Sequence, residues 1–142
     1  VNIGVCNGHY SSILCMYPGL VPPGGFQNPT GWIFQQHGQL LSCLGFGGSV
    51  VIGICGSGQH NDCPGGSSHG IRCANHQDFY IDQNSCNWAR TAGHGVETTC
   101  EGITGEQWVM TGRCGSGENE DCGGASVRLQ CCKLIYTRFP TE

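Results

Sequence analysis

The chain has 142 residues, a formal net charge of −4, 11% charged residues, 25 glycines and 12 cysteines. This length suits one domain with a substantial hydrophobic core. A disordered chain would carry more charge, and a nucleic-acid-binding protein would carry a basic patch that six scattered lysines and arginines do not make. Composition therefore excludes both classes.

Cysteine at this density is typical of secreted proteins, because cytosolic thiols stay reduced. The chain starts at Val1 without a methionine, so we expect a mature, secreted, extracellular form whose leader has been removed. No apolar run approaches the ~18 residues of a spanning helix, so we expect no membrane span. Zinc-type CxxC pairs are absent from the sequence, which favours a disulfide framework over a metal site.

Short β-branched or aromatic runs predict the secondary structure. In chain order they lie at 50–52, 108–110, 126–129 and 134–136, and turn-forming residues bound them. Helical periodicity is weak because glycines interrupt almost every long window. We therefore predict an all-β fold.

A repeat organises these strands. Residues 50–63 resemble residues 109–122, and Cys55, Cys63 and Cys73 recur 59 positions later as Cys114, Cys122 and Cys132. We predict one domain over 1–142, with units at 28–74 and 87–133 and a third unit (134–142 plus 1–15) split across the termini. The last strands would then pair beside the first. The alternative is two repeats and an unrelated N-terminal arm.

The repeat also constrains the disulfides. Each unit supplies a local pair that clips a hairpin, each complete unit adds a longer pair, and the two remaining cysteines pair by elimination. The predicted pairs are Cys6–Cys15, Cys55–Cys63, Cys114–Cys122, Cys43–Cys73, Cys100–Cys132 and Cys86–Cys131. Adjacent strand residues point to opposite faces, so Cys131 and Cys132 cannot share a partner, although their two partners could be exchanged.

Two kinds of residue are candidates for sugar binding. Trp32 and Trp88 stand in polar segments, either as packing residues at corners or as stacking platforms for sugar rings. Asp62 and Asp121 precede the second hairpin cysteine in both copies, with Asn61 and Glu120 beside them. These carboxylates either fix turns or bind calcium or sugar hydroxyls.

A third group is the densest set of potential metal ligands, comprising His60, Asp62, His69, His76 and Asp78. The second copy does not preserve the histidines, which favours polar residues that decorate a hairpin over a metal site. We expect no metal and no cofactor.

The unit resembles that of the vitelline membrane outer layer protein I family. The residues that carry the resemblance are Cys43, Gly47, Val51, Gly53, Asp62 and Cys73, and again Cys100, Gly105, Val109, Gly112, Asp121 and Cys132. The resemblance implies a rigid, secreted β-prism with three pseudo-equivalent, disulfide-stapled repeats. It also implies a link to egg coats and carbohydrates, but no catalytic residue is carried over.

These observations favour a secreted, non-enzymatic, lectin-like protein whose partners are glycans or glycoproteins, with one weak site in each copy. The first alternative is a structural protein of an egg coat, mucus or extracellular matrix, in which disulfide stability is the function. The second is a small secreted hydrolase or transferase that acts on glycans through carboxylates such as Asp62, Asp78 or Asp121.

Overall fold

The computed structural model describes residues 2–7, 11–15, 26–35, 39–55, 63–67, 69–92, 97–100, 107–114 and 127–137. The strands in this part of the chain are β1 (Asn2–Asn7), β2 (Ser11–Cys15), β3 (Phe26–Gln27), β4 (Ile33–Gln35), β5 (Leu41–Ser42), β6 (Val50–Cys55), β7 (His69–His76), β8 (Phe79–Ala92), β9 (Glu97–Thr99), β10 (Trp108–Cys114) and β11 (Val127–Tyr136). Two short 3₁₀ turns, η1 (Leu44–Phe46) and η2 (Pro64–Gly66), complete the set. The all-β prediction is confirmed, and each predicted run contributes to a strand.

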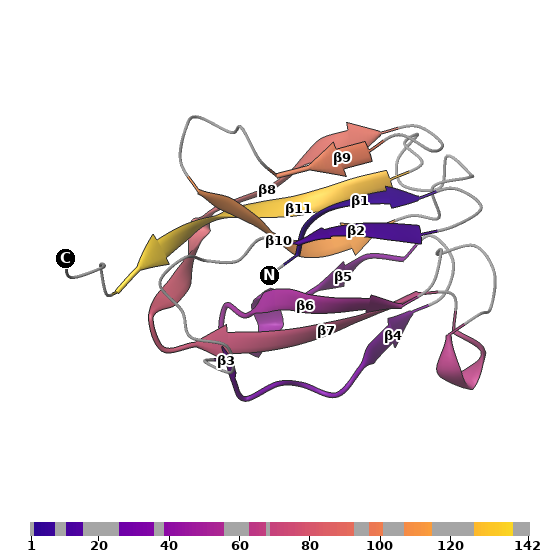
Figure 1. Ribbon diagram of the computed structural model, residues 1–142, viewed down its shortest axis with the longest axis horizontal. Helices are drawn as coiled ribbons and strands as arrows, with labels where there is room; N and C mark the ends of the chain where they lie inside the picture. The colour runs from indigo at the N-terminus through magenta and orange to yellow at the C-terminus, as the bar shows by residue number, and fades with distance from the viewer. Residues whose placement is uncertain are drawn as a thin grey trace.

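The strands form antiparallel pairs in two hydrogen-bonded sheets. One sheet has the order β2-β1-β9, and the other runs β3-β7-β8-β11-β10-β5, with β4 and β6 also paired to β7. A single residue pair, His76 with Phe79, joins β7 to β8. The larger sheet therefore divides at this tight turn, with β4, β6 and β7 on one side and β8, β10 and β11 on the other (Figure 1).

The core lies where these strand groups face one another. A buried cluster joins Val51 of β6 and Ile71 of β7 to Met110 of β10 and Leu129 of β11. Trp108 is buried in the same cluster. Alternate residues along each strand supply these side chains because successive strand residues point to opposite faces.

Three hairpins share one register. Val51 faces Cys73 in the β6–β7 pair, and Met110 faces Cys131 in the β10–β11 pair. In the β1–β2 pair, Asn2 faces Cys15. Each register is then interrupted by one extra residue, and the pairing resumes at a glycine: Gly53, Gly112 or Gly4.

This register explains which disulfides form. Cys43–Cys73 and Cys55–Cys63 are confirmed, but the structure pairs Cys86 with Cys132 and Cys100 with Cys131. The predicted Cys86–Cys131 and Cys100–Cys132 pairs are therefore wrong. Equivalent residues of β6 and β10, such as Val51 and Met110, are 59 positions apart in the sequence, whereas those of β7 and β11 are 58 apart. Cys131 is therefore the counterpart of Cys73. Cys114 is also disulfide-bonded, and its predicted partner, Cys122, lies outside the described residues.

The predicted Cys6–Cys15 bridge is also wrong. Cys15 is an exposed free thiol, and the backbone places Cys6 opposite Ser12. Three residues of strand, roughly 10 Å, separate Ser12 from Cys15, whereas the Cα atoms of a disulfide lie within about 7 Å. Cys15 occupies the register position of Cys73 and Cys131 and is therefore not the equivalent of Cys63, the second cysteine of the local bridge in the first complete unit.

The expected pairing of the last strand beside the first does not occur among residues 134–137, the part of the predicted tail that the structure describes. Residues 134–136 continue β11 and pair with the start of β8. In place of the tail, β9 pairs with β1, bringing Thr99 opposite Gly4. In the same way, β5 pairs with β10, bringing Ser42 opposite Gly112.

Candidate aromatic binding surface

Trp32 and Phe34 form a pair of rings on the surface of the β4–β7–β6 sheet. Trp32 is 44% exposed, and Phe34 is half-buried two residues further along. Their ring planes are inclined by only 16°, with centroids 6.3 Å apart. At that separation near-parallel rings are offset and do not cover each other. The pair therefore presents a continuous aromatic surface, called the aromatic platform below.

Glycines lie beneath both rings. A Cβ atom added at Gly53 would lie 3.1 Å from Cη2 of Trp32, and one added at Gly70 would lie 2.6 Å from Cδ1 of Phe34. Both distances are shorter than ordinary van der Waals contact. The rings can approach the sheet this closely because β6 and β7 carry no side chain at these two points.

Thr30 fixes the segment that carries Trp32. Its N–H donates to the carbonyl of Cys73 at 2.8 Å, and its hydroxyl oxygen accepts from the N–H of Cys73 at 3.0 Å. Its carbonyl accepts from Nε of Arg72, also at 3.0 Å. Three hydrogen bonds to adjacent residues of β7 therefore hold the backbone two positions before Trp32, and the platform is pre-organised.

The sequence identified only half of the platform. Trp32 was a candidate, and its exposure supports the stacking alternative over burial at a corner. Phe34 was missed, although its signal was present. Residues two apart on a strand share a face, so the alternation in Trp32-Ile33-Phe34 places both rings on one side.

The other predicted sugar-binding residues are not brought to this surface. Trp88 is half-buried in β8, where its carbonyl accepts from Nη2 of Arg128 at 3.2 Å. Ile33 lies opposite Ile71 of β7, and Arg90 lies opposite Leu129, which is the equivalent of Ile71 in β11. Ile33 and Arg90 are therefore counterparts, and the counterpart of Trp32 is residue 89. The two tryptophans are thus one residue out of register, at a point where the pairing of β8 with β11 is itself interrupted. The candidates Asn61, Asp62, Glu120 and Asp121 lie outside the described residues.

The histidines and carboxylates considered as metal ligands are not brought together in the described part of the chain. His69 and His76 stand at opposite ends of β7, roughly 23 Å apart at 3.3 Å per residue. Asp78 is buried in the β7–β8 turn, where its N–H donates to Nδ1 of His76 at 2.9 Å. No group of three or more potential metal ligands occurs among the described residues. His60 and Asp62 lie outside them.

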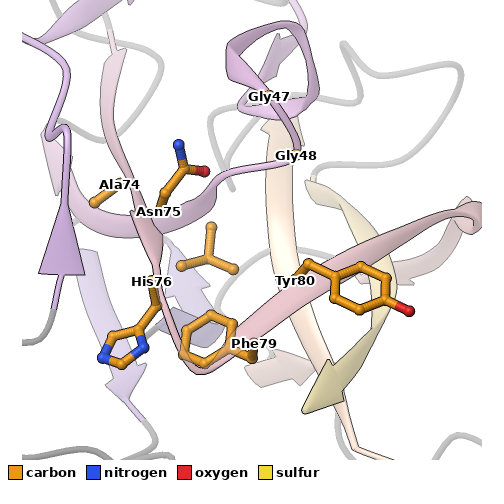
Figure 2. Close-up of a pocket in the computed structure, with 8 residues that line it drawn as sticks. Gly47, Gly48, Ala74, Asn75, His76, Phe79 and Tyr80 are labelled. Atoms are coloured by element: carbon orange, nitrogen blue, oxygen red, sulfur yellow. The ribbon is translucent and has the colours of Figure 1, made fainter. Parts of the chain in front are cut away.

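A small pocket lies at the opposite end of β7 from Gly70 (Figure 2). Its volume is about 210 Å³, and it is lined by Gly47, Gly48, Val50, Ala74, Asn75, His76, Phe79 and Tyr80. Val50, Ala74 and Phe79 supply its apolar wall, polar atoms line it to an equal extent, and Tyr80 is exposed at its rim. Pockets for drug-sized ligands are typically 300–1,000 Å³, so this one suits a single small group.

Hydrogen bonding fixes the polar wall of the pocket. Oγ of buried Ser49 lies 2.6 Å from the carbonyl oxygen of Phe46 and 2.9 Å from Oδ1 of Asn75. One hydroxyl proton cannot serve two acceptors, and the two orientations of an asparagine amide have almost the same shape. Turning the amide by 180° lets Nδ2 donate to Ser49. The Asn75 oxygen then faces Gly47, offering the pocket a hydrogen-bond acceptor.

No family model, curated protein or solved structure matches the chain. The described residues include no helix that is long and apolar enough to cross a membrane.

Proposed function

We propose that the protein is a secreted, disulfide-rich, lectin-like protein that binds carbohydrate on the aromatic platform without catalysing a reaction. The observation that carries this proposal is the pair of offset, near-parallel rings of Trp32 and Phe34. Its partners would be glycans or glycoproteins.

The chemistry of the platform fits the C–H face of a pyranose ring. Aromatic rings supply a large apolar area, and sugar C–H groups approach the electron-rich ring face favourably. Thr30 already holds the backbone beside Trp32, so little backbone freedom remains to be lost on binding. Pre-organisation of this kind increases affinity because less ordering is needed when the ligand binds.

We also propose a β-prism-like architecture with three pseudo-equivalent units. Support comes from the register shared by the β1–β2, β6–β7 and β10–β11 hairpins. Further support comes from the equivalent way in which β5 joins β10 and β9 joins β1. The platform itself is not repeated in the described residues, because β5 covers Gly112, the counterpart of Gly53.

Secretion is supported by the four disulfides among the described residues. Bonds of this kind persist in oxidising compartments and are reduced in the cytosol. We therefore assign the protein to the extracellular space.

A glycan array tests the proposal, with Trp32→Ala as the decisive variant. Loss of one stacking ring should weaken binding about tenfold, corresponding to ~1.4 kcal/mol. Leu40→Ala is the matched control because Leu40 is another exposed apolar residue. Binding to no glycan at high protein density would refute the proposal. Equal losses of glycan affinity in the two variants would show that sugar does not bind on the aromatic platform.

Gly53→Ala is a subtler test of the same surface. The new Cβ would meet the far edge of Trp32, so the ring should be displaced and glycan affinity reduced severalfold, with little loss of stability. Gly31→Ala is the control because a Cβ there meets no atom within 4 Å. Calorimetry would measure both affinities, and unchanged affinity in Gly53→Ala would contradict the geometry described above.

A structural role is the second candidate, and the buried bridges favour it. Cys43, Cys73, Cys100 and Cys131 are all 0% exposed, so reductants reach the two bridges that they form only when the fold opens. A protein of a coat or matrix benefits from this resistance. A silent glycan array together with slow reduction of these bridges in native protein would favour this function over sugar binding.

A further inference from the structure

Arg72 stands beside the aromatic platform on the same face of the sheet. Its neighbours Ile71 and Cys73 are fully buried, so alternation along β7 turns Arg72 outward. The Cβ position of Gly53 lies 3.1 Å from Cη2 of Trp32 and 3.6 Å from Cβ of Arg72. The indole ring and the base of the arginine side chain are therefore immediate neighbours.

The guanidinium group of Arg72 is oriented but only partly used. Its Nε–H donates to the carbonyl of Thr30 at 3.0 Å, which fixes the plane of the group. Arginine carries five N–H donors, and within the described residues the four on Nη1 and Nη2 make no hydrogen bond. Two of these, one on each nitrogen, point in parallel and match two oxygens of a carboxylate or sulfate.

We propose that Arg72 and the aromatic platform form one site for an anionic sugar. The pyranose ring stacks on Trp32 while its carboxylate or sulfate accepts hydrogen bonds from Nη1 and Nη2 of Arg72. This inference rests on the proposed function and narrows its ligand class. The chain as a whole is acidic, with a net charge of −4, so attraction of an anionic glycan depends on this local positive charge.

Three oligosaccharide probes test the inference on the unmodified protein. One contains a uronic acid, the second is the same compound with its carboxyl reduced to an alcohol, and the third carries sulfate in place of the carboxylate. The uronate or the sulfated probe should bind at least about tenfold more tightly than the reduced probe. This preference should weaken as salt is raised, because Arg72 is partly exposed to solvent. The ratio between the two anionic probes identifies the preferred anion.

Arg72→Gln should remove the preference, so that the anionic and the reduced probes bind equally. The affinity for all probes should fall by a common factor, because the hydrogen bond from Arg72 to Thr30 also helps to hold the platform. Lys133→Gln is the matched control, since it removes one positive charge on β11. Arg72→Lys keeps the charge but loses the paired donors, so it should restore only part of the preference. Circular dichroism would check that each variant is folded.

The outcomes separate the two proposals. If no probe binds, both the proposed function and this inference fail. If the reduced probe binds as well as the anionic probes, sugar binding stands and the role of Arg72 is refuted. An unchanged anionic preference in folded Arg72→Gln would also overturn the inference.

Discussion

At the scale of single residues, the absence of a side chain creates the platform. Gly70 lies directly under Phe34, and a Cβ there would also approach the carbonyl of Ile33 at 3.2 Å. Glycine in a strand ordinarily weakens it, by roughly 0.5–1 kcal/mol relative to alanine. Here an aromatic ring covers the bare backbone, which recovers buried apolar area at the position where the side chain is missing.

Tyr136 gives the molecule a pH dependence at alkaline pH. Burial raises the pKa of its phenol above the ordinary value of 10.0, because the phenolate loses hydration. The hydroxyl also donates to Oε1 of Gln107 at 2.7 Å, a bond that only the protonated form can make. The unfolded chain therefore loses this proton at lower pH than the folded chain. The free energy of unfolding should fall as pH rises through 10, because the unfolded state binds fewer protons there.

Urea titrations of the wild type and of Tyr136→Phe at a series of pH values would measure this dependence. The variant loses one hydrogen bond at every pH, but its stability should fall less steeply above pH 10. Parallel slopes in the two proteins would contradict the assignment to Tyr136.

Some residue-level features were predictable from the sequence and others were not. The Cys55–Cys63 bridge followed from the repeated spacing, and it forms. The exposure of Trp32 could not be predicted, because it depends on Gly53, which lies two strands away across β7. The role of Cys15 was misassigned because it has two plausible counterparts, Cys63 and Cys73, and only strand register distinguishes them.

At the scale of elements, a short sequence motif marks where the extra residue interrupts the strand pairing in each of the three hairpins. Each first strand contains a glycine two residues before a cysteine, as in Gly53-Ile54-Cys55, and the extra residue comes immediately before that glycine. Extra residues of this kind bend a strand and increase its twist. The three strands that carry this extra residue, β1, β6 and β10, also contact one another.

Gly112→Ala tests how much one of these positions contributes. Its Cβ would lie 2.5 Å from the carbonyl oxygen of Leu41 and 3.2 Å from Cα of Ser42. Both are backbone atoms of β5, so no side-chain rotation relieves the clash. We expect destabilisation of about 1–3 kcal/mol, and hydrogen exchange should show loss of protection at β5 before the rest of the sheet.

Gly45→Ala is the control for this prediction, since a Cβ there meets no atom within 4 Å. Equal stability of the two variants in urea would show that β5 is not held against β10.

The positions of the strands were predictable, whereas their partners were not. The β-branched runs at 50–52 and 108–110 gave β6 and β10 correctly. The pairing of β9 with β1 could not be predicted, because Glu97–Thr99 is a short polar strand with no hydrophobic alternation. The one-residue difference in spacing that selects Cys131 was hidden by the adjacent Cys132.

At the scale of the whole molecule, strands link neighbouring hairpins. β5 leads into Cys43, which bonds to β7, yet β5 itself pairs with β10. β9 leads into Cys100, which bonds to β11, yet β9 pairs with β1. β5 and β9 are therefore each tied to one hairpin by the disulfide that follows the strand and to another hairpin by strand pairing. In an open repeat array, by contrast, each unit contacts only its nearest neighbours.

This linkage predicts one cooperative unfolding transition. Unfolding of oxidised protein followed by far-ultraviolet circular dichroism and by tryptophan fluorescence should give coincident curves, because no hairpin keeps its partners when another opens. Two separated transitions would show that the hairpins unfold independently.

The pairing of β9 with β1 has a consequence for biosynthesis. Gly4 leaves the ribosome long before Thr99, so the first hairpin must wait for its neighbour while most of the chain is made. Contacts so distant in sequence form slowly, and the exposed strand edge is prone to aggregation during that interval. The first hairpin is therefore open to aggregation until the strand that covers its edge has been made.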